Sequence, residues 1–294
     1  MLDLVFMIDN SPSMAPKQEK LKAQFPKLIA ALKDPNGGTL PDLRVAILDS
    51  DLGTGGAYAS GSSCGPKALP DGTVSVYGDM GQFQMIGATG CGVTGTNATY
   101  LETKGSTGLN FSGDINNVFA CLAGNLGTLG CGEEHQLQSF EFAFVASNLS
   151  NVNNQQHQML RGNANLGLVF LTDEDDCSAA LNDAMFGPKS ELSNESASLR
   201  CYTRSHACSG VNLTQSPPGY PTSAAFQTTL NNCSARIGDT CNGQDVSQPT
   251  ECNPLRDVKV MADEIKALKS DPANQIFVAG IFGWPLSGTD PATA

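Results

Sequence analysis

The stretch Leu2–Met14, LDLVFMIDNSPSM, decides the fold of this 294-residue chain. Its first part, Leu2–Ile8, is almost entirely apolar, which is typical of a parallel strand covered on both faces. Apolar residues at helical spacing begin a few positions later, so Asp9–Ser13 is expected to form a strand-to-helix turn. Open α/β sheets place their ligands at turns of this kind.

Asp9, Ser11 and Ser13 offer a carboxylate and two hydroxyls at alternate positions of this turn. Magnesium takes oxygen ligands and keeps several waters, so these groups can converge on one hard cation. The alternative is an Asx or serine turn that caps the next helix. Because the turn follows a strand and precedes a helix, its context favours the metal site.

Three further apolar runs predict buried parallel strands: Leu43–Leu48, Leu166–Leu171 and Gln275–Phe282. Amphipathic spacing predicts helices over residues 18–32, with a kink at Pro26, and near 115–122, 137–145 and 258–268. The alternation of strands and helices predicts an α/β fold with a doubly wound, mostly parallel sheet.

We expect one domain over residues 1–294 with two insertions, at about 53–112 and 177–254. Both insertions are polar and contain cysteines. We expect disulfides to stabilise them, because they have too few apolar residues to form hydrophobic cores of their own. Long ordered loops usually carry or cover function, and inert decoration is the alternative. Entry directly on a strand, and a linker-like tail after Trp284, suggest a segment of a longer protein.

The net charge is −12, and the chain has ten cysteines but only three histidines. A negative field repels nucleic acid and anionic lipid, so neither is an expected partner. No CxxC pair occurs, which favours disulfides over a zinc site. Disulfides persist outside the cytosol, so we expect the protein at the cell surface, in the periplasm or outside the cell. No apolar stretch reaches the ~20 residues that span a bilayer, and a lipoprotein signal would have to precede Met1.

The segment Phe6–Met14 resembles the first motif of the metal-ion-dependent adhesion site of von Willebrand factor A domains, a family with a Rossmann-like sheet. The family draws its metal ligands from three loops. The resemblance implies that Asp9, Ser11 and Ser13 supply the first loop. Leu168–Asp173 matches the third-loop pattern of a strand that ends in Thr-Asp, so Asp173 is implied as a ligand, directly or through a water.

The second loop departs from the family pattern, which usually offers a threonine ahead of a helix. Thr128 lies far from the expected helix start, whereas Glu134 lies in the expected first turn. A carboxylate there also suits the helix dipole, which is the alternative role for Glu134. We take Glu134 as the candidate metal ligand, with Thr128 as the other option. A ligating Glu134 would tighten cation binding and weaken the attraction for an acidic partner.

Three more acidic residues follow Asp173, namely Glu174, Asp175 and Asp176. They could add metal affinity or form a calcium site, but charge runs usually face water, and we favour that interpretation for Asp175 and Asp176. His135 is expected on the surface of the first helical turn, because no activated serine or cysteine can be tied to it.

The residues and the resemblance together predict an extracytoplasmic, metal-dependent adhesion module and not an enzyme. The cation would be Mg²⁺, or alternatively Mn²⁺ or Ca²⁺, and an acidic residue of a protein partner would complete its coordination. Two alternatives are a structural surface protein with a degenerate, empty site and a metal-dependent hydrolase. The common nucleotide, zinc-protease and serine-hydrolase motifs do not occur in the sequence.

Overall fold

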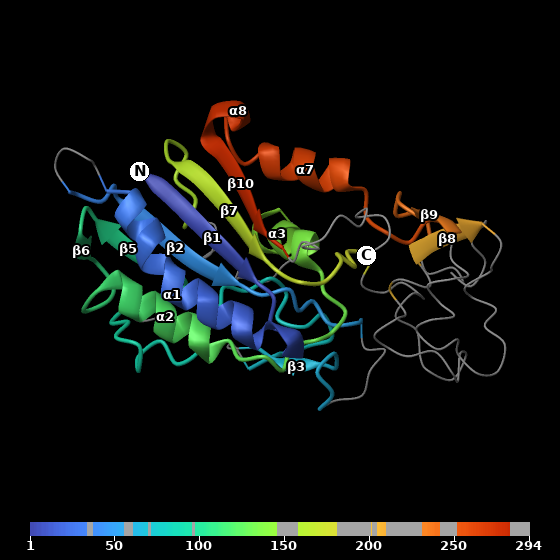
Figure 1. Ribbon diagram of the computed structural model, residues 1–294, viewed down its shortest axis with the longest axis horizontal. Coiled ribbons are helices and arrows are strands. Elements are labelled where there is room, and N and C mark those ends of the chain that lie inside the picture. The colour runs from blue at the N-terminus through green and yellow to red at the C-terminus, as the bar shows by residue number, and fades with distance from the viewer. Residues whose placement is uncertain are drawn as a thin grey trace.

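The computed structural model has a mixed α/β fold built on a six-stranded, mostly parallel sheet (Figure 1). The structure describes residues 1–33, 38–55, 61–69, 72–95, 98–145, 158–180, 201, 205–209, 231–241 and 252–282. For residues 207–209 and 231–233 it describes the backbone alone. The α/β class and the mostly parallel sheet predicted from the sequence are confirmed.

The four predicted strands form the parallel part of the sheet: β1 (Leu2–Ile8), β2 (Leu43–Leu48), β7 (Asn165–Leu171) and β10 (Ile276–Ile281). The strand order is β10-β7-β1-β2-β5-β6, with β1 in the interior. The register pairs Met7 with Leu48 of β2 and Ile8 with Leu171 of β7. Parallel strands that start in register also end together, so the turns after β1, β2 and β7 share one edge of the sheet.

Helices cover both faces of the sheet (Figure 1). On one face lie α1 (Ala15–Ala31), which follows the short η1 (Pro12–Met14), and α2 (Ile115–Asn125). On the other face lie α3 (Gln136–Phe144) and α7 (Val258–Lys266), which pack together, and the short α8 (Pro272–Gln275) precedes β10. α1 runs through Pro26 as one helix.

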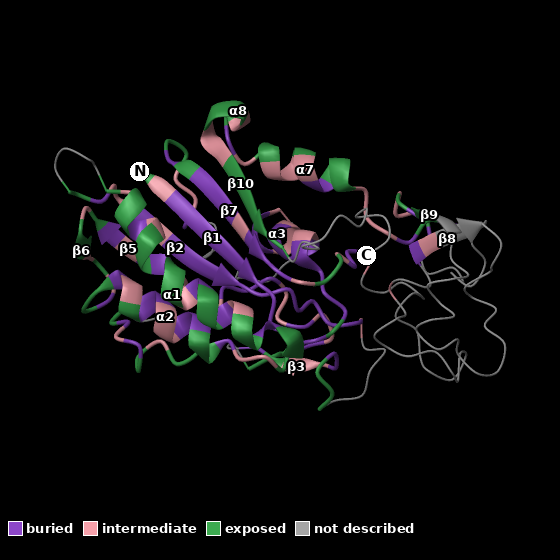
Figure 2. Cartoon of the chain, in the orientation of Figure 1, coloured by how far each residue is buried: buried purple, intermediate pink, exposed green. Residues whose placement is uncertain are grey.

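Aromatic side chains fix β1 between the helices. The ring of Phe6 lies 5.7 Å from that of Phe25 on α1 and 5.0 Å from that of Phe119 on α2. On the opposite face, Val5 and Met7 of β1 share a buried cluster with Phe140 of α3, whose ring meets that of Phe170 on the neighbouring β7 at 4.8 Å. Burying a side chain of this kind contributes about 1.5–3 kcal/mol. The strand that leads to the candidate turn is therefore held from both sides, as its burial shows (Figure 2).

The first expected insertion contributes to the main sheet. Its strand β5 (Leu101–Lys104) pairs antiparallel with β2, and β6 (Thr107–Gly108) extends the edge. The short strands β3 (Lys67–Ala68) and β4 (Val74–Ser75) form a separate ribbon. Phe111 enters the core under α1 and α2. Residues 53–112 thus extend the sheet as well as decorating it.

Disulfides were predicted, and the described residues contain four: Cys64–Cys131, Cys91–Cys121, Cys177–Cys201 and Cys241–Cys252. Such bonds persist in oxidising compartments. Within the second expected insertion, β8 (His206–Ser209) pairs antiparallel with β9 (Asn231–Ala235), and much of 177–254 lies outside the described residues. Among the described helices, none combines the length and apolar character needed to cross a bilayer.

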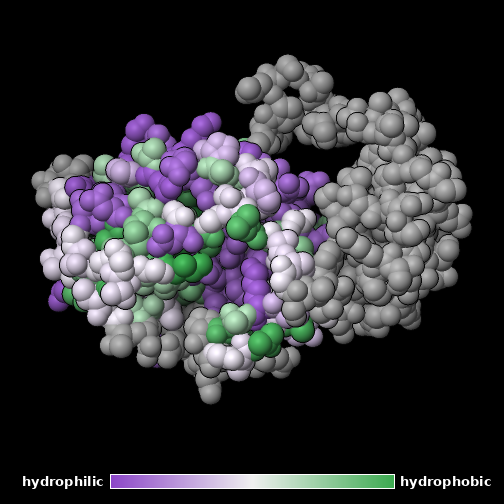
Figure 3. Space-filling view, turned by 90° about the horizontal axis from the view of Figure 1, so that it is seen from below, coloured by the Kyte–Doolittle hydropathy of each residue, from purple (hydrophilic) through white to green (hydrophobic). Residues whose placement is uncertain are grey.

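The expectation of burial is wrong for the edge strand β10, whose side chains are exposed from Phe277 onward (Figure 2). Phe277 is 54% exposed and Val278 66%, and these neighbours point to opposite faces of the sheet. On the face shown in Figure 3, by contrast, apolar side chains occur in small groups among hydrophilic ones. β10 therefore presents apolar surface on both faces at the end of the sheet.

Candidate functional site

Asp9 lies directly after β1 and its side chain is fully buried. Its backbone N–H donates to Leu171 O at 2.9 Å, which continues the pairing of β1 with β7. The carboxylate accepts hydrogen bonds from Ser11 N at Oδ1 (2.7 Å) and from Thr172 Oγ1 at Oδ2 (2.8 Å). Burial raises the pKa of Asp9, and these two hydrogen bonds oppose that rise. The Asx turn considered from the sequence is thus present, and it orients the carboxylate.

A chain of oxygen contacts joins the turn after β1 to the turn after β7. Ser11 Oγ lies 3.2 Å from Ser13 Oγ, and Ser13 Oγ donates to Asp173 Oδ1 at 3.0 Å. Ser11 is buried, whereas Ser13 is exposed. The structure therefore brings together Asp9, Ser11, Ser13 and Asp173, with Ser13 on the side that solvent reaches.

The hydroxyl of Thr172 organises the third loop. It donates to Asp9 and accepts from Gln136 Nε2 and from Glu174 N, each at 3.1 Å. Gln136 is the first residue of α3, so one hydroxyl ties the ends of β1 and β7 to that helix. From the sequence, Thr172 was used only as part of the Thr-Asp pattern. Its hydrogen bonds to Asp9 and Gln136 could not be predicted, because they join segments that are distant in the sequence.

Glu134 lies before α3 and not in its first turn, because the helix begins at Gln136. The side chain is 3% exposed, and Oε1 has no hydrogen-bond partner among the described residues. Burial raises the pKa of Glu134 to about 9, and the negative charges of Asp9 and Glu174 add to the rise. The helix-start interpretation is wrong in detail, and the carboxyl instead faces the charges of the candidate site.

Thr128, the other second-loop option, lies half-buried in the segment between α2 and α3. This segment is tied to the first turn through Gln18, whose Nε2 donates to Asp9 O and to Gly127 O at 3.0 Å each. The segment between α2 and α3 therefore supports the backbone of the first turn.

The acidic residues after Asp173 have separate environments. Asp176 accepts from Leu137 N at 2.7 Å and from Ser178 N at 2.8 Å, so it caps the start of α3. The expectation that Asp176 faces water is therefore wrong, while the same expectation for Asp175, which is exposed, is confirmed. Glu174 is exposed as a residue, but its carboxyl is partly shielded from water, and this desolvation raises its pKa, followed by the negative charge of Asp173.

His135 is buried, which corrects the expectation of a surface residue. Its backbone N–H donates to Ser50 O at 3.0 Å, and its ring Nε2 lies 3.2 Å from Gly53 O. Burial lowers the pKa of His135 to about 4, so the imidazole is neutral at pH 7. The segment before α3 is folded under the end of β2, a placement that helical periodicity alone does not reveal.

A second group of carboxylates lies beside the first turn and was not singled out from the sequence. Asn10 Nδ2 donates to Asp49 Oδ2 at 3.0 Å, directly after β2. Burial raises the pKa of both Asp49 and Asp79, while Lys67 forms an ion pair with Asp51. This group carries its own cation in Lys67, and it holds the first turn through Asn10.

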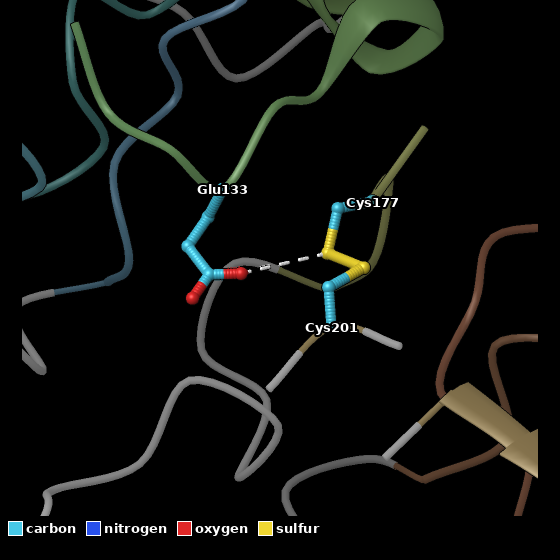
Figure 4. A group of neighbouring side chains, drawn as sticks. All are labelled: Glu133, Cys177 and Cys201. Carbon is cyan, nitrogen blue, oxygen red and sulfur yellow. Dashed lines mark hydrogen bonds between the residues drawn. A yellow bond between two sulfur atoms is a disulfide. The ribbon is translucent and has the colours of Figure 1, made fainter. Parts of the chain in front are cut away.

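Glu133, Cys177 and Cys201 also approach one another, with ligand atoms within 4.8 Å (Figure 4). Glu133 Oε2 lies 3.8 Å from Cys177 Sγ. A metal requires thiolates from cysteine, but these two sulfurs are joined in a disulfide. The arrangement therefore pins the chain just after the third loop and is not a metal centre in the oxidised protein.

Lys17 is a site residue that the sequence interpretation missed. It lies in the first turn of α1, and its ammonium donates to Ser13 O at 3.1 Å and forms an ion pair with Asp173 Oδ2. The signal in the sequence was its spacing, because a lysine four residues after Ser13 on a starting helix can reach back to the turn.

No protein-family model matches the chain, and no curated protein matches it. The solved structures that match include the adhesive tip pilin GBS104 from group B Streptococcus agalactiae. That match has 20% identity and a TM-score of 0.23, and it covers 61% of this chain and 47% of the pilin chain. The chain thus spans about half the length of that pilin. A TM-score this low carries no argument about fold or function.

Proposed function

We propose that the chain is an extracytoplasmic binding module of the von Willebrand factor A type, which holds a divalent cation and binds a protein partner through it. Asp9, Ser11, Ser13, Asp173 and Glu134 are the proposed ligands. The observation that carries the proposal is the 3.0 Å hydrogen bond between Ser13 Oγ and Asp173 Oδ1, which joins two loops from distant parts of the chain.

The donor set supports a hard cation such as Mg²⁺, Mn²⁺ or Ca²⁺, because every proposed ligand atom is an oxygen. The buried Oε1 of Glu134, without a hydrogen-bond partner among the described residues, is an atom that a cation would satisfy. The described residues place three acidic, His or Cys ligand atoms within 4.8 Å only at Glu133, Cys177 and Cys201. The carboxylates proposed here are spaced more widely, so hydroxyls and waters would complete the contacts.

A cation bound there would supply a position for an acidic group of the partner. The chain's own residues fix the oxygens in advance, since Ser11 N and Thr172 Oγ1 hold the Asp9 carboxylate from both sides. Ser11 and Ser13 are neutral, so Asp9 and Asp173 together balance the two charges of a divalent ion, and the open coordination position, more than net charge, would take the acidic group. An ionised Glu134 would add a third negative charge, so we propose firm cation binding with a weakened attraction for the partner.

The topology supports the family-level part of the proposal. Parallel strands in the order β10-β7-β1-β2, an antiparallel edge and helices on both faces agree with a doubly wound sheet. The disulfides support an oxidising location. We propose binding and not catalysis, because the buried His135 is held on a backbone oxygen and is unsuited to act as a base.

A structural surface protein with a degenerate site is the second candidate. The observation that favours it is the contact of the Lys17 ammonium with Asp173. A lysine in this position can supply part of the positive charge that a metal ion would bring.

Isothermal calorimetry with MgCl₂, MnCl₂ and CaCl₂ tests the proposal on Asp9→Ala, Asp9→Asn and the wild type. We expect a saturable heat for the wild type, a rise in its melting temperature relative to EDTA, and loss of both in the two variants. Asp263→Ala is the matched control, because this exposed carboxylate lies on α7. Equal cation affinity in a folded Asp9 variant, judged by circular dichroism in EDTA, would overturn the assignment.

A further inference from the structure

The ammonium of Lys17 occupies a defined place beside two proposed metal ligands. It donates to Ser13 O at 3.1 Å and forms an ion pair with Asp173 Oδ2. The other carboxylate oxygen, Asp173 Oδ1, accepts the hydrogen bond from Ser13 Oγ at 3.0 Å. One carboxylate is therefore shared between a hydroxyl of the site and a cation that belongs to the chain.

The pair is partly shielded from water. The side chain of Asp173 is 16% exposed and that of Lys17 is 38% exposed. The Lys17 stem starts from the first turn of α1, so the ammonium can leave Asp173 and extend into solvent without any change in the helix. A divalent ion that uses Asp173 would meet this ammonium at short range, and like charges a few ångströms apart repel even in water.

We propose that Lys17 is a tethered cation that competes with the divalent ion for Asp173 and thereby raises the ion concentration at which the site fills. This inference rests on the proposed function and adds a residue that sets its threshold. With Asp173 paired to Lys17, the excess negative charge of the loop is partly neutralised. When the ion binds, the ammonium moves outward, where it can attract the acidic group of a partner.

Lys17→Gln tests the competition, because glutamine keeps a polar chain of similar length without the charge. We expect Mg²⁺ to bind this variant about tenfold more tightly than the wild type in low salt, a difference that shrinks as salt screens the repulsion. The melting temperature in EDTA should fall while that in saturating MgCl₂ does not, so the gap between the two conditions widens. Isothermal calorimetry and thermal melts measure both effects.

The matched control is Lys20→Gln, which makes the same change of net charge at an exposed position one turn farther along α1. It should change Mg²⁺ affinity by less than twofold. Equal or weaker Mg²⁺ binding by Lys17→Gln, with the wild type binding normally, would overturn the competition and leave the metal site in place. Binding by Lys17→Gln alone would mean that the ammonium wins outright in the wild type, which supports the inference. Binding by neither protein would refute the proposed metal site and the competition with it.

Discussion

Glu134→Gln should remove a pH dependence from the stability of the cation-free protein. Burial and the neighbouring charges raise the pKa of Glu134 from 4.5 to about 9. Between these values the native state keeps a proton that the unfolded chain has released. Stability therefore falls as pH rises through this window, by about 1.4 kcal/mol per pH unit. Glutamine cannot ionise, so the variant lacks this slope.

The size of the effect follows from the same pKa. A pH of 7 lies about 2.5 pH units above the unfolded-state pKa of Glu134. Over this interval the free energy of unfolding falls by about 3 kcal/mol. Wild type and Glu134→Gln should therefore unfold with similar free energies near pH 4.5. At pH 7 in EDTA, the variant should be more stable by about 3 kcal/mol. The side chain is 3% exposed, so solvent screening reduces this difference little.

Urea unfolding followed by circular dichroism from pH 5 to pH 8.5, in EDTA, measures this difference directly. Other carboxyls titrate in both proteins, so the difference between the two curves isolates Glu134. Glu19→Gln, with a side chain 72% exposed on α1, is the control and should follow the wild type. Parallel curves for wild type and Glu134→Gln would show that Glu134 is ionised at neutral pH, and the argument from its burial would fail.

Thr172→Val should cost about 1–3 kcal/mol in urea unfolding, because Asp9 Oδ2 loses the hydroxyl donor and Glu174 N loses its acceptor. Thr172→Ser keeps the hydroxyl and should recover most of the loss, whereas an equal loss in both would point to the methyl group instead. Arg161→Met should cost about 3–5 kcal/mol, because it takes the Nε donor at 2.8 Å and the guanidinium charge away from the fully buried Asp3, which keeps the backbone N–H of residue 161 and Lys269 Nζ at 4.0 Å. The double variant with Asp3→Leu should regain stability if the poorly compensated carboxylate causes the loss, and no regain in thermal melts would contradict that cause.

The parallel part of the sheet was predictable because its strands are continuous apolar runs with little local ambiguity. The turn at Asp9–Ser13 was predictable for the same reason, since its place is set by the strand before it. β5 was missed because Leu101–Lys104 is short and half polar, and only its pairing with β2 makes it a strand of the sheet. Nonlocal pairing of this kind leaves little trace in the local sequence.

The second loop shows where sequence reasoning fails at the candidate site. Helical spacing placed Glu134 and His135 in a first turn, and that placement implied exposure. In the structure the helix begins at Gln136, and both residues are buried against the ends of β1 and β2. The capping role of Asp176 and the ion pair of Lys17 likewise depend on segments that meet only in the folded chain.

The exposed edge strand β10 bears on the tendency of the protein to self-associate. Among the strands that the structure describes, β10 ends the sheet, carries apolar residues on both faces and has no strand paired along its outer side. An edge of this kind is a template on which another extended chain can pair. The net charge of −12 keeps copies apart at low ionic strength. Added salt screens this repulsion but does not weaken the attraction between apolar strand surfaces. The protein should therefore become less soluble as the ionic strength rises.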